Sequence, residues 1–407
     1  MDSITFLHAA DLHLDSPFIG LANVPKTIFD SMRESTFLAL DKLVQTAIER
    51  QVDFVLITGD LFDNERQSLK AQIRLKKAFE LLETKNIMVY LSYGNHDYTK
   101  GNIHPITYPD NVFIFPDEQV SSFIYYKEDQ PIARIYGFSY ENRAVTEGKV
   151  HEYNVIDRSI PYHIGMLHGS IRSNNEHDMY APFQLSELEE KDFHYWALGH
   201  IHQRQELKSS PPVIYPGNIQ GRHRKETGEK GCYVVELSSA GCQKSFVPLQ
   251  AIQFSRLAFN ASDCTEIHQL EEKLQAACRQ LTKEYPQMID LAISGEQRLI
   301  EAWEQEGLIE EVIDIVNAAM QLVPNWCYIF RYHTEVDYRS IDPYLYEGDH
   351  FIGELLRQIE STSIQPFLHD LYKQKQARKY VDTLRKEEVE QIKLEAQHML
   401  IKGLMEE

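Results

Sequence analysis

Nine side chains that can bind metal ions or carry protons occur in five short blocks along this chain of 407 residues. Carboxylate, amide and imidazole donors of this kind suit Mn²⁺, with Fe, Zn or Mg as alternatives. Two such ions a few ångströms apart favour cleavage of phosphate esters, because they stabilise the charge that develops during in-line displacement. In chain order the blocks contain Asp11 and His13, then Asp60, then Asn95, His96 and Asp97, then His168, and finally His200 and His202.

The spacing of these residues suggests how two ions could share them. Asp60 is the natural bridging ligand, since a carboxylate has two oxygens and can reach both ions. Asp11 and His13 lie two positions apart at the end of a predicted strand, so their side chains point the same way and can share one ion. The remaining donors are an amide oxygen and three imidazoles, from Asn95, His168, His200 and His202.

The third block also offers a candidate general acid. His96 lies next to a predicted ligand, and an imidazole with a pKa near neutrality can protonate a leaving alkoxide. Asp97 could orient that imidazole or adjust its charge. We therefore expect His96 and Asp97 to be catalytic residues rather than metal ligands.

Each block directly follows an apolar run of strand length. Runs rich in Val, Ile and aromatic residues, with few polar interruptions, are typical of strands buried on both faces. The carboxyl ends of such strands are where an α/β sheet places its chemistry, so the blocks are expected to converge there. Sharp turns at the strand ends are expected from Gly59, Gly94, Gly169 and Gly199. The five runs cover residues 4–10, 53–58, 87–92, 162–167 and 193–198.

The elements around these strands predict an α/β fold. Apolar residues at helical spacing predict helices over 25–50 and 67–85, so the chain opens as strand–helix–strand–helix–strand. Two mixed β-sheets sandwiched by helices would account for the order of elements. Further short strands are predicted at 112–115, 121–126, 133–138, 213–215, 231–237 and 244–249.

A change in composition near residue 250 predicts further domains. We expect a catalytic domain over 1–250 and a small α/β domain over 251–340, with helices at 266–283 and 297–320 and strands at 288–294 and 326–335. Residues 341–407 are expected to be wholly helical. The last helix carries one apolar stripe, which suits either packing on its own domain or docking of a partner helix.

Composition limits where the protein works and what it binds. No apolar stretch reaches the roughly 18 residues of a membrane span, and no signal peptide is evident. The five cysteines form no metal-binding spacing, so reduced thiols in a cytoplasmic protein are expected. The net charge of −20 argues against tight stand-alone binding to nucleic acid. The clearest basic cluster suits a solvated hairpin loop or a phosphate contact equally, and contains Arg222, His223, Arg224, Lys225 and Lys230.

The metal-site hypothesis depends on the blocks occurring together. Any one block could be an ordinary turn or a surface strand. Five blocks in order, each after a predicted strand, supply a complete set of ligands for two metals, which favours a metal centre. Histidines outside the blocks lack this support and are expected in the core or on the surface; they are His8, His104, His151, His163, His177, His194 and His223.

The ordered motifs D-x-H, G-D-x-x-D, G-N-H-D, H-G and G-H-x-H resemble those of the calcineurin-like metallophosphoesterase superfamily, over roughly residues 1–250. The stretches 6–15 and 58–63 are similar to the SbcD-type DNA repair exonucleases, and the chain most resembles the YhaO-type bacterial proteins. This resemblance implies the metallophosphoesterase fold, a Mn²⁺-dependent nuclease acting on DNA ends, and a capping domain over 251–340. It also implies a helical region at 341–407 that docks an SbcC-like coiled-coil ATPase, and a homodimer through helices of the catalytic domain.

The resemblance also assigns the site residue by residue. One ion would be held by Asp11, His13, Asp60 and His202, and the other by Asp60, Asn95, His168 and His200. His96 would be the catalytic histidine. The chain departs from the family at position 63, which is Asp where some relatives have a histidine that affects exonuclease action. It also has Asn at position 64, where protein phosphatases have an Arg.

Three functions compete at this point. The favoured one is a two-metal phosphodiesterase acting on DNA ends with an ATPase partner. The second is a metallophosphoesterase for a small nucleotide or phosphoester, which would need neither the extra domain nor the helical stripe. The third is a partner-binding scaffold with a vestigial site, which the intact set of ligands argues against. Residues contacting DNA would include Arg222, Arg224 and Lys225.

Overall fold

The structure of the chain is a computed structural model. It describes residues 3–18, 20–21, 24–63, 67–101, 106–172, 180–281, 284–335 and 351–363, together with scattered positions between 366 and 400. The chain divides into two compact units. The first comprises residues 1–256, 276–290 and 317–330, and the second comprises 257–275, 291–316 and 331–407. The domain boundaries expected at 250 and 340 stay a prediction.

The first unit contains a six-stranded sheet with the order β12-β11-β1-β2-β3-β4. Strands β1 to β4 run parallel, and β11 pairs antiparallel with β1 on one side and with β12 on the other. Strands β1, β2 and β3 follow one another in the chain, and because they are parallel their carboxyl ends lie at the same edge of the sheet. The strands are β1 (Ile4–Ala9), β2 (Phe54–Thr58), β3 (Met88–Ser92), β4 (Val112–Ile114), β11 (Gly231–Ser238) and β12 (Gly241–Pro248).

A second six-stranded sheet in the same unit has the order β5-β6-β7-β8-β10-β9. Its four central strands are parallel, and the two outer strands pair antiparallel with their neighbours. Both sheets are therefore mixed, as the sequence predicts. The strands are β5 (Ser121–Lys127), β6 (Gln130–Gly137), β7 (Tyr162–His168), β8 (Tyr195–Gly199), β9 (Gln205–Ser209) and β10 (Pro212–Tyr215).

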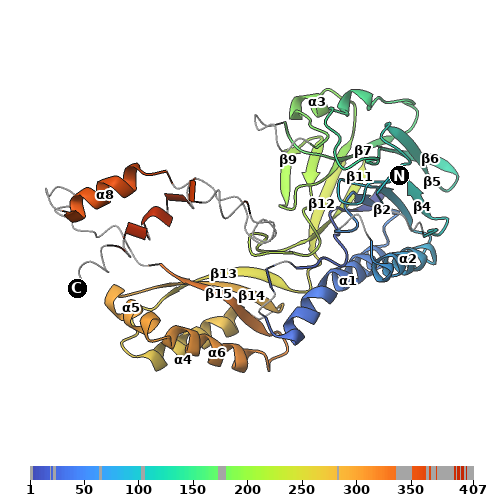
Figure 1. Cartoon of the computed structure of the whole chain (residues 1–407). Helices are drawn as coiled ribbons and strands as arrows, with labels where there is room; N and C mark the ends of the chain where they lie inside the picture. The colour runs from blue at the N-terminus through green and yellow to red at the C-terminus, as the bar shows by residue number, and fades with distance from the viewer. Residues whose placement is uncertain are drawn as a thin grey trace. The chain divides into compact units, whose positions relative to one another are not determined.

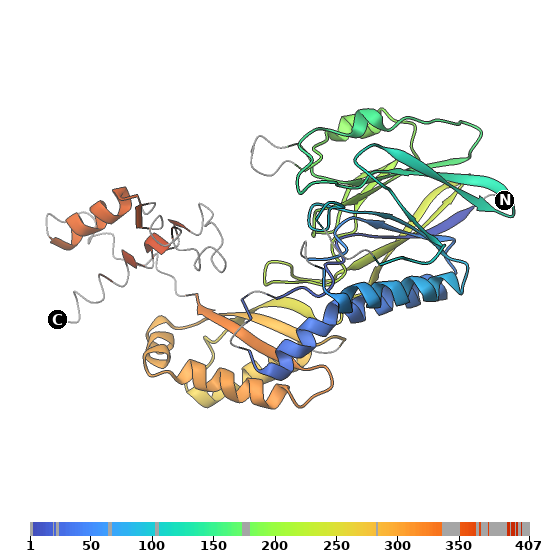
Figure 2. The same ribbon diagram turned by 45° about the vertical axis from the view of Figure 1, so that its right-hand side comes forward.

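The two sheets pack face to face. Apolar side chains alternate along each central strand, so that in β1 Phe6 faces the second sheet while Leu7 faces the helices. Helices α1 (Lys26–Glu49) and α2 (Leu69–Glu83) lie together along the outer face of the first sheet (Figures 1 and 2). The short helix α3 (Leu185–Glu189) and the 3₁₀ turn Val150–Glu152 cover the outer face of the second. This layering confirms the predicted fold class.

The chain continues into a three-stranded sheet with the order β13-β14-β15 and the helices α4 to α6. The helix predicted over 297–320 is in fact two helices, because Gly307 adopts a φ of +71° between them and interrupts the helical hydrogen bonding. These elements are β13 (Gln253–Asn260), α4 (Ile267–Leu281), β14 (Gln287–Ser294), α5 (Gln297–Gln305), α6 (Leu308–Met320) and β15 (Cys327–Thr334).

Within residues 341–407 the structure describes one helix of more than one turn, α8 (Phe351–Ser361). Half of the apolar stripe expected on the last helix lies outside the described residues. Among the helices that are described, none combines the length and the apolar character needed to cross a membrane.

Candidate metal centre

The five polar blocks meet at the carboxyl ends of strands from both sheets. Three loops come from the first sheet, after β1, β2 and β3, and the other donors come from the ends of β7 and β8. Their convergence appears as clusters of carboxylate and imidazole atoms that lie within 4.8 Å of one another. Two of the clusters consist of predicted ligands alone, and they are Asp11, His13 and His202, and Asp11, Asp60 and His168.

One half of the centre is built around Asp11, His13 and His202. The Nε2 atoms of His13 and His202 lie 3.0 Å apart. The carboxylate of Asp11 is fixed beside them, because both of its oxygens accept the backbone N–H of His200 at 3.1 Å. Two imidazole nitrogens and a carboxylate that face one another are donors that suit a divalent ion.

The other half is built around Asn95. Its Oδ1 lies 3.0 Å from His168 Nε2 and 3.1 Å from His200 Nδ1. Asp60 stands between the halves, with Oδ2 at 3.5 Å from His168 Nε2 and 3.8 Å from His13 Nε2. This position between the two halves suits a bridging carboxylate.

Several of the donor atoms face one another without a proton between them, which favours a bound cation. His168 Nδ1 lies 3.0 Å from the Thr58 carbonyl oxygen, so Nδ1 carries the proton and Nε2 presents a lone pair. That lone pair faces two acceptors, Asn95 Oδ1 and Asp60 Oδ2. Three buried acceptor atoms directed at one point repel each other unless a positive ion lies among them. This arrangement is the observation that most directly indicates a metal.

Burial prepares two of the predicted ligand histidines for metal binding. Desolvation lowers the pKa of His13 well below its ordinary value and lowers that of His200 to about 3. Neutral imidazoles leave their lone pairs available to a metal. For Asp60 burial alone opposes ionisation, but His168 and His96 outweigh it and lower the pKa of the carboxyl, so this residue is an anion at neutral pH.

The backbone of the ligand loops is strained. Four predicted ligands have φ values in the left-handed region, which non-glycine residues seldom adopt. Such strain costs about 1–3 kcal/mol per residue and concentrates at functional sites. The values are 53° for Asp11, 42° for His13, 51° for Asp60 and 98° for His200.

The glycines beside the ligands serve two purposes. Gly59 adopts a φ of +78°, as expected for a turn. Gly94, Gly169 and Gly199 do not adopt φ values in the left-handed region, so the turns expected there do not depend on a positive φ. They are needed for space, because a Cβ at Gly94 would collide with Asp60 and His168 and one at Gly199 would collide with the Thr58 carbonyl.

His96 lies at the rim of the centre and is partly buried. Its Nδ1 donates to the Asp63 carbonyl oxygen at 2.9 Å, which leaves Nε2 as the atom available to a substrate. Its ring centre is 5.0 Å from that of His13. The side chain is thus beside the predicted ligands and separately oriented, as a proton donor should be.

Asp97 is placed differently from our expectation. Its carboxylate accepts the backbone N–H groups of Gly94 at 2.7 Å and Leu61 at 2.6 Å, so it ties the second and third loops together. The imidazole of His96 is oriented by the Asp63 carbonyl instead. The physical reason is tertiary, because the loop after β2 brings the N–H of Leu61, 36 residues away in the sequence, to one oxygen while the N–H of Gly94 on the same loop as Asp97 takes the other.

The basic cluster divides between the site and the surface. Arg222 turns inwards, where its Nη1 forms an ion pair with Asp63 Oδ1 and its Nη2 lies 3.5 Å from His202 Nδ1. Arg224 is partly exposed, with Nη1 at 3.7 Å from Asp290, and Lys225 is exposed. The cluster is therefore not a simple solvated hairpin, since Arg222 reaches the metal centre.

Sequence reasoning missed Glu226. Its Oε1 lies 2.6 Å from His202 Nδ1, and its side chain is only 7% exposed. An acidic residue within a basic cluster was the available signal. His202 and the other neighbouring cations outweigh burial and hold the pKa of the Glu226 carboxyl well below its usual range.

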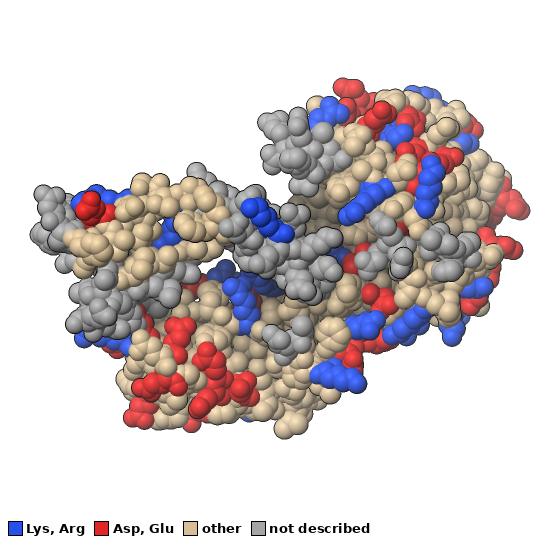
Figure 3. All heavy atoms as spheres, in the orientation of Figure 1, with Lys and Arg blue, Asp and Glu red and all other residues tan. Residues whose placement is uncertain are grey.

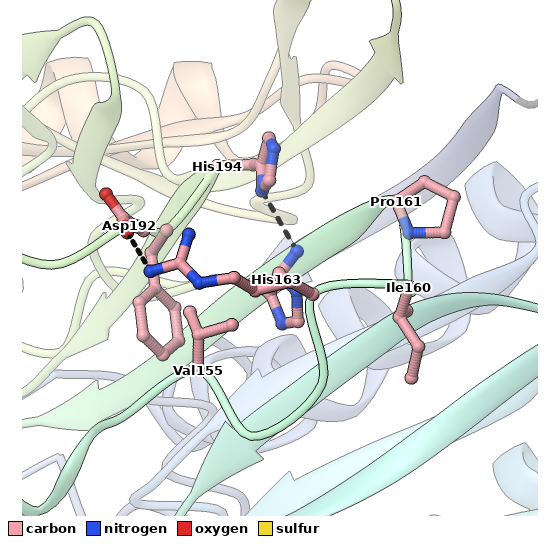
Figure 4. Close-up of a pocket in the computed structure, with 8 residues that line it drawn as sticks. Val155, Ile160, Pro161, His163, Asp192 and His194 are labelled. Carbon is pink, nitrogen blue, oxygen red and sulfur yellow. Dashed lines mark hydrogen bonds and ion pairs between the residues drawn. The ribbon is translucent and has the colours of Figure 1, made fainter.

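A pocket of about 420 Å³ lies at the ends of β7 and β8 remote from the ligands (Figure 4). His194 Nδ1 accepts the backbone N–H of His163 at 3.1 Å, and His163 Nδ1 lies 3.0 Å from the Tyr136 hydroxyl. Arg158 and Asp192 pair across the rim at 2.7 Å. These contacts give both imidazoles structural roles, and none of the predicted site residues lines this pocket.

A two-sheet fold with these donors at its strand ends defines a metallophosphoesterase. The chain belongs to the calcineurin-like phosphoesterase family, whose sequence profile matches residues 4–204.

Individual relatives extend this result. The chain is 36% identical to the uncharacterized metallophosphoesterase YhaO of Bacillus subtilis, over 99% of this chain and 98% of that protein. It is 29% identical to the DNA double-strand break repair protein Mre11 of Methanocaldococcus jannaschii, over 57% of this chain and 62% of that one. It is 23% identical to the SbcD component of the nuclease SbcCD from Staphylococcus saprophyticus, over 66% of this chain and 74% of that protein.

Proposed function

We propose that this protein is a two-metal-dependent phosphodiesterase, an exonuclease that hydrolyses DNA ends in DNA repair together with an SbcC-like coiled-coil ATPase. The observation that carries the proposal is the convergence of the predicted ligands beside a separately oriented histidine. The relatives named for double-strand break repair and as a nuclease component support DNA as the substrate class.

The metal ligands follow from the two halves of the centre. Asp11, His13, Asp60 and His202 would hold one ion, and Asp60, Asn95, His168 and His200 the other. Two divalent ions supply Lewis-acid stabilisation of the phosphoryl oxygens and a nucleophile at neutral pH. Mn²⁺ is favoured because the set mixes carboxylate, amide and imidazole donors.

His96 would act on the leaving group. Donation from Nδ1 to the Asp63 carbonyl fixes the ring, so that Nε2 is the atom that can hold or release a proton at the substrate. The imidazole forms its hydrogen bond with the backbone of Asp63, and the contact of His96 with Asp60 Oδ1 is made by the backbone N–H, so loss of the imidazole should spare metal binding.

Arg222 would contact the scissile phosphate. A guanidinium suits phosphate oxygens because it offers several donors in a fixed plane. Its position beside His202 and Asp63 brings it close to the reacting group. Arg224 and Lys225, further out on the same loop, would contact the DNA backbone.

The surface charge favours a partner in DNA binding. Acidic side chains gather over α4 to α6 on the face shown in Figure 3, and acidic and basic groups are interspersed over much of the rest. Such a surface neutralises few phosphates, so a partner with basic surface would be needed for tight binding. We propose the capping role for residues 251–340 and partner docking for 341–407, where Phe351 is 69% exposed. The homodimer stays a prediction.

A cytoplasmic location belongs to the same proposal. All five cysteines are free thiols in the structure. Unpaired cysteines are usual in reducing compartments.

The test is Mn²⁺-dependent cleavage of end-labelled duplex and single-stranded DNA by the full-length protein, with bis-p-nitrophenyl phosphate alongside. His96→Ala should lower both activities by about 10²–10⁴-fold and leave Mn²⁺ binding unchanged. The control is His151→Ala, since this imidazole is exposed and lies outside the blocks. Full activity in His96→Ala, or cleavage that ignores Mn²⁺, would contradict the proposal.

The same experiment separates the two enzymatic alternatives. If only the small diester is cleaved, an SbcC-like coiled-coil ATPase, the proposed partner, is added. DNA cleavage that appears on addition supports the nuclease. Continued inactivity on DNA favours a small phosphoester as the substrate.

A further inference from the structure

The two imidazoles on the Asp11 side of the centre each have a carboxylate behind them. His202 Nδ1 lies 2.6 Å from Glu226 Oε1. His13 Nδ1, which makes no direct hydrogen bond, lies 3.4 Å from Asp63 Oδ1. In both rings Nε2 points to the predicted metal position and Nδ1 points to an anion.

The imidazoles on the Asn95 side are supported differently. His168 Nδ1 is held by the neutral Thr58 carbonyl. His200 presents Nδ1 itself to Asn95. For the described residues, no hydrogen bond or ion pair connects either ring with a carboxylate other than the bridging Asp60. The two halves therefore differ by two anions behind their ligands.

Glu226 is fixed in place by its other contacts. Its Oε2 accepts the Asn218 amide at 2.9 Å and the backbone N–H of Arg222 at 2.7 Å. Arg222 in turn pairs with Asp63, so one guanidinium links the loop that holds Glu226 to the second carboxylate. A buried anion held by three donors has little freedom to leave His202.

A carboxylate behind a metal-binding imidazole has two effects. It keeps a proton on Nδ1, so that the neutral ring directs its Nε2 lone pair at the metal, and it raises the electron density that the ring offers to the metal. Removing such a partner commonly weakens metal binding 10–100-fold.

We propose that the two metal sites load unequally, with the His13–His202 site filling first because Glu226, assisted by Asp63, positions and strengthens its imidazoles. This inference rests on the metal centre of the proposed function but goes beyond it. Glu226 and Asp63 are positioning residues here, since neither belongs to the predicted set of ligands.

Titration of the metal-free full-length protein with Mn²⁺ tests the proposal, by calorimetry and by the electron paramagnetic resonance signal of free Mn²⁺. The wild type should bind in two steps. Glu226→Gln should weaken the tighter step 10–100-fold and leave the weaker step unchanged, and Asp63→Asn should act in the same direction. Glu229→Gln is the matched control, since Glu229 is on the same loop but is 47% exposed.

Two further variants show which site each binding step belongs to. They also keep the test valid if the Glu226→Gln variant does not fold. His202→Ala should abolish the tighter step, and Asn95→Ala the weaker one. Two equal steps in the wild type, or loss of the tighter step in Asn95→Ala alone, overturn the unequal loading. Equal weakening of both steps by Glu226→Gln overturns the positioning role. A wild type that binds no Mn²⁺ overturns the metal centre itself, which is a different result.

Discussion

His168 Nε2 and Asn95 Oδ1 lie 3.0 Å apart with no proton to share between them. The proton of this imidazole is on Nδ1, where the Thr58 carbonyl accepts it. Asp60 Oδ2 adds a third acceptor at 3.5 Å from the same nitrogen. The sites at which a divalent ion would be bound are thus under electrostatic repulsion without it, and this relationship leads to the first two predictions.

Metal removal should lower the stability of the protein. A ligand that binds only the folded state stabilises it by about 2.7 kcal/mol per site at a hundredfold excess over Kd. We expect the melting temperature to rise by several degrees with Mn²⁺ and to fall to the metal-free value with a chelator, as measured by differential scanning calorimetry. An unchanged melting temperature at saturating Mn²⁺ would contradict this prediction.

Asp60→Asn should abolish the binding of both ions, although the asparagine side chain has nearly the same shape as the aspartate side chain. Asp60 is nearly fully buried between the two halves, and an amide in its place loses the charge and directs an N–H₂ at one half. We expect Mn²⁺ content per chain, measured by atomic absorption after dialysis, to fall from near two to near zero. Asp192→Asn is the control, since Asp192 is exposed. Retention of one tightly bound ion would show that Asp60 does not bridge.

Gly94→Ala should disable the centre although it adds only a methyl group. The new Cβ would overlap the carboxylate of Asp60 and the ring of His168, and both are packed too tightly to move freely. We expect at least a tenfold loss of Mn²⁺ affinity at both sites with the far-UV circular dichroism unchanged. Gly295→Ala is the control, where the nearest atoms lie at 3.3 Å. If Gly94→Ala binds Mn²⁺ as tightly as the wild type does, the prediction is wrong.

His8 should make the protein sensitive to acid. Its Nδ1 lies 3.0 Å from the Tyr195 hydroxyl and its Nε2 3.1 Å from the Leu198 carbonyl, and burial lowers its pKa from 6.5 to about 3. Between these two pH values the unfolded chain binds a proton that the folded chain does not. The free energy of unfolding therefore falls as the pH falls below 6.5.

The effect of His8 can be isolated by substitution. Between pH 7 and pH 5 this residue should cost about 2 kcal/mol of stability, calculated from the two pKa values. His8→Gln should be less stable at pH 7, and its deficit should shrink by about that amount at pH 5. Urea unfolding of the metal-free proteins at both pH values measures it, with the exposed His151→Gln as control. A deficit that is constant with pH would refute the prediction.

Much of the fold could be predicted because its signals are local. Continuous apolar runs define β1, β2, β3, β7 and β8, and helical spacing places α1 and α2 within two residues of their observed ends. The exposed edge strand β9 and the strand β13 were missed, because half-exposed strands with many polar residues lack that signal. Gly307 was also a local signal, but the prediction of one long helix over 297–320 did not take it into account.

The sequence by itself determined which donors the centre would have and where they would lie, since each one follows a strand and the ends of parallel strands must meet. Only the tertiary structure decided which atoms face one another. The contact between His202 and Glu226 and the inward turn of Arg222 depend on how a loop folds back over the sheet. Asp97 binds backbone instead of His96 for the same reason. Such contacts join residues distant in sequence through side-chain rotamers, and no local pattern records them.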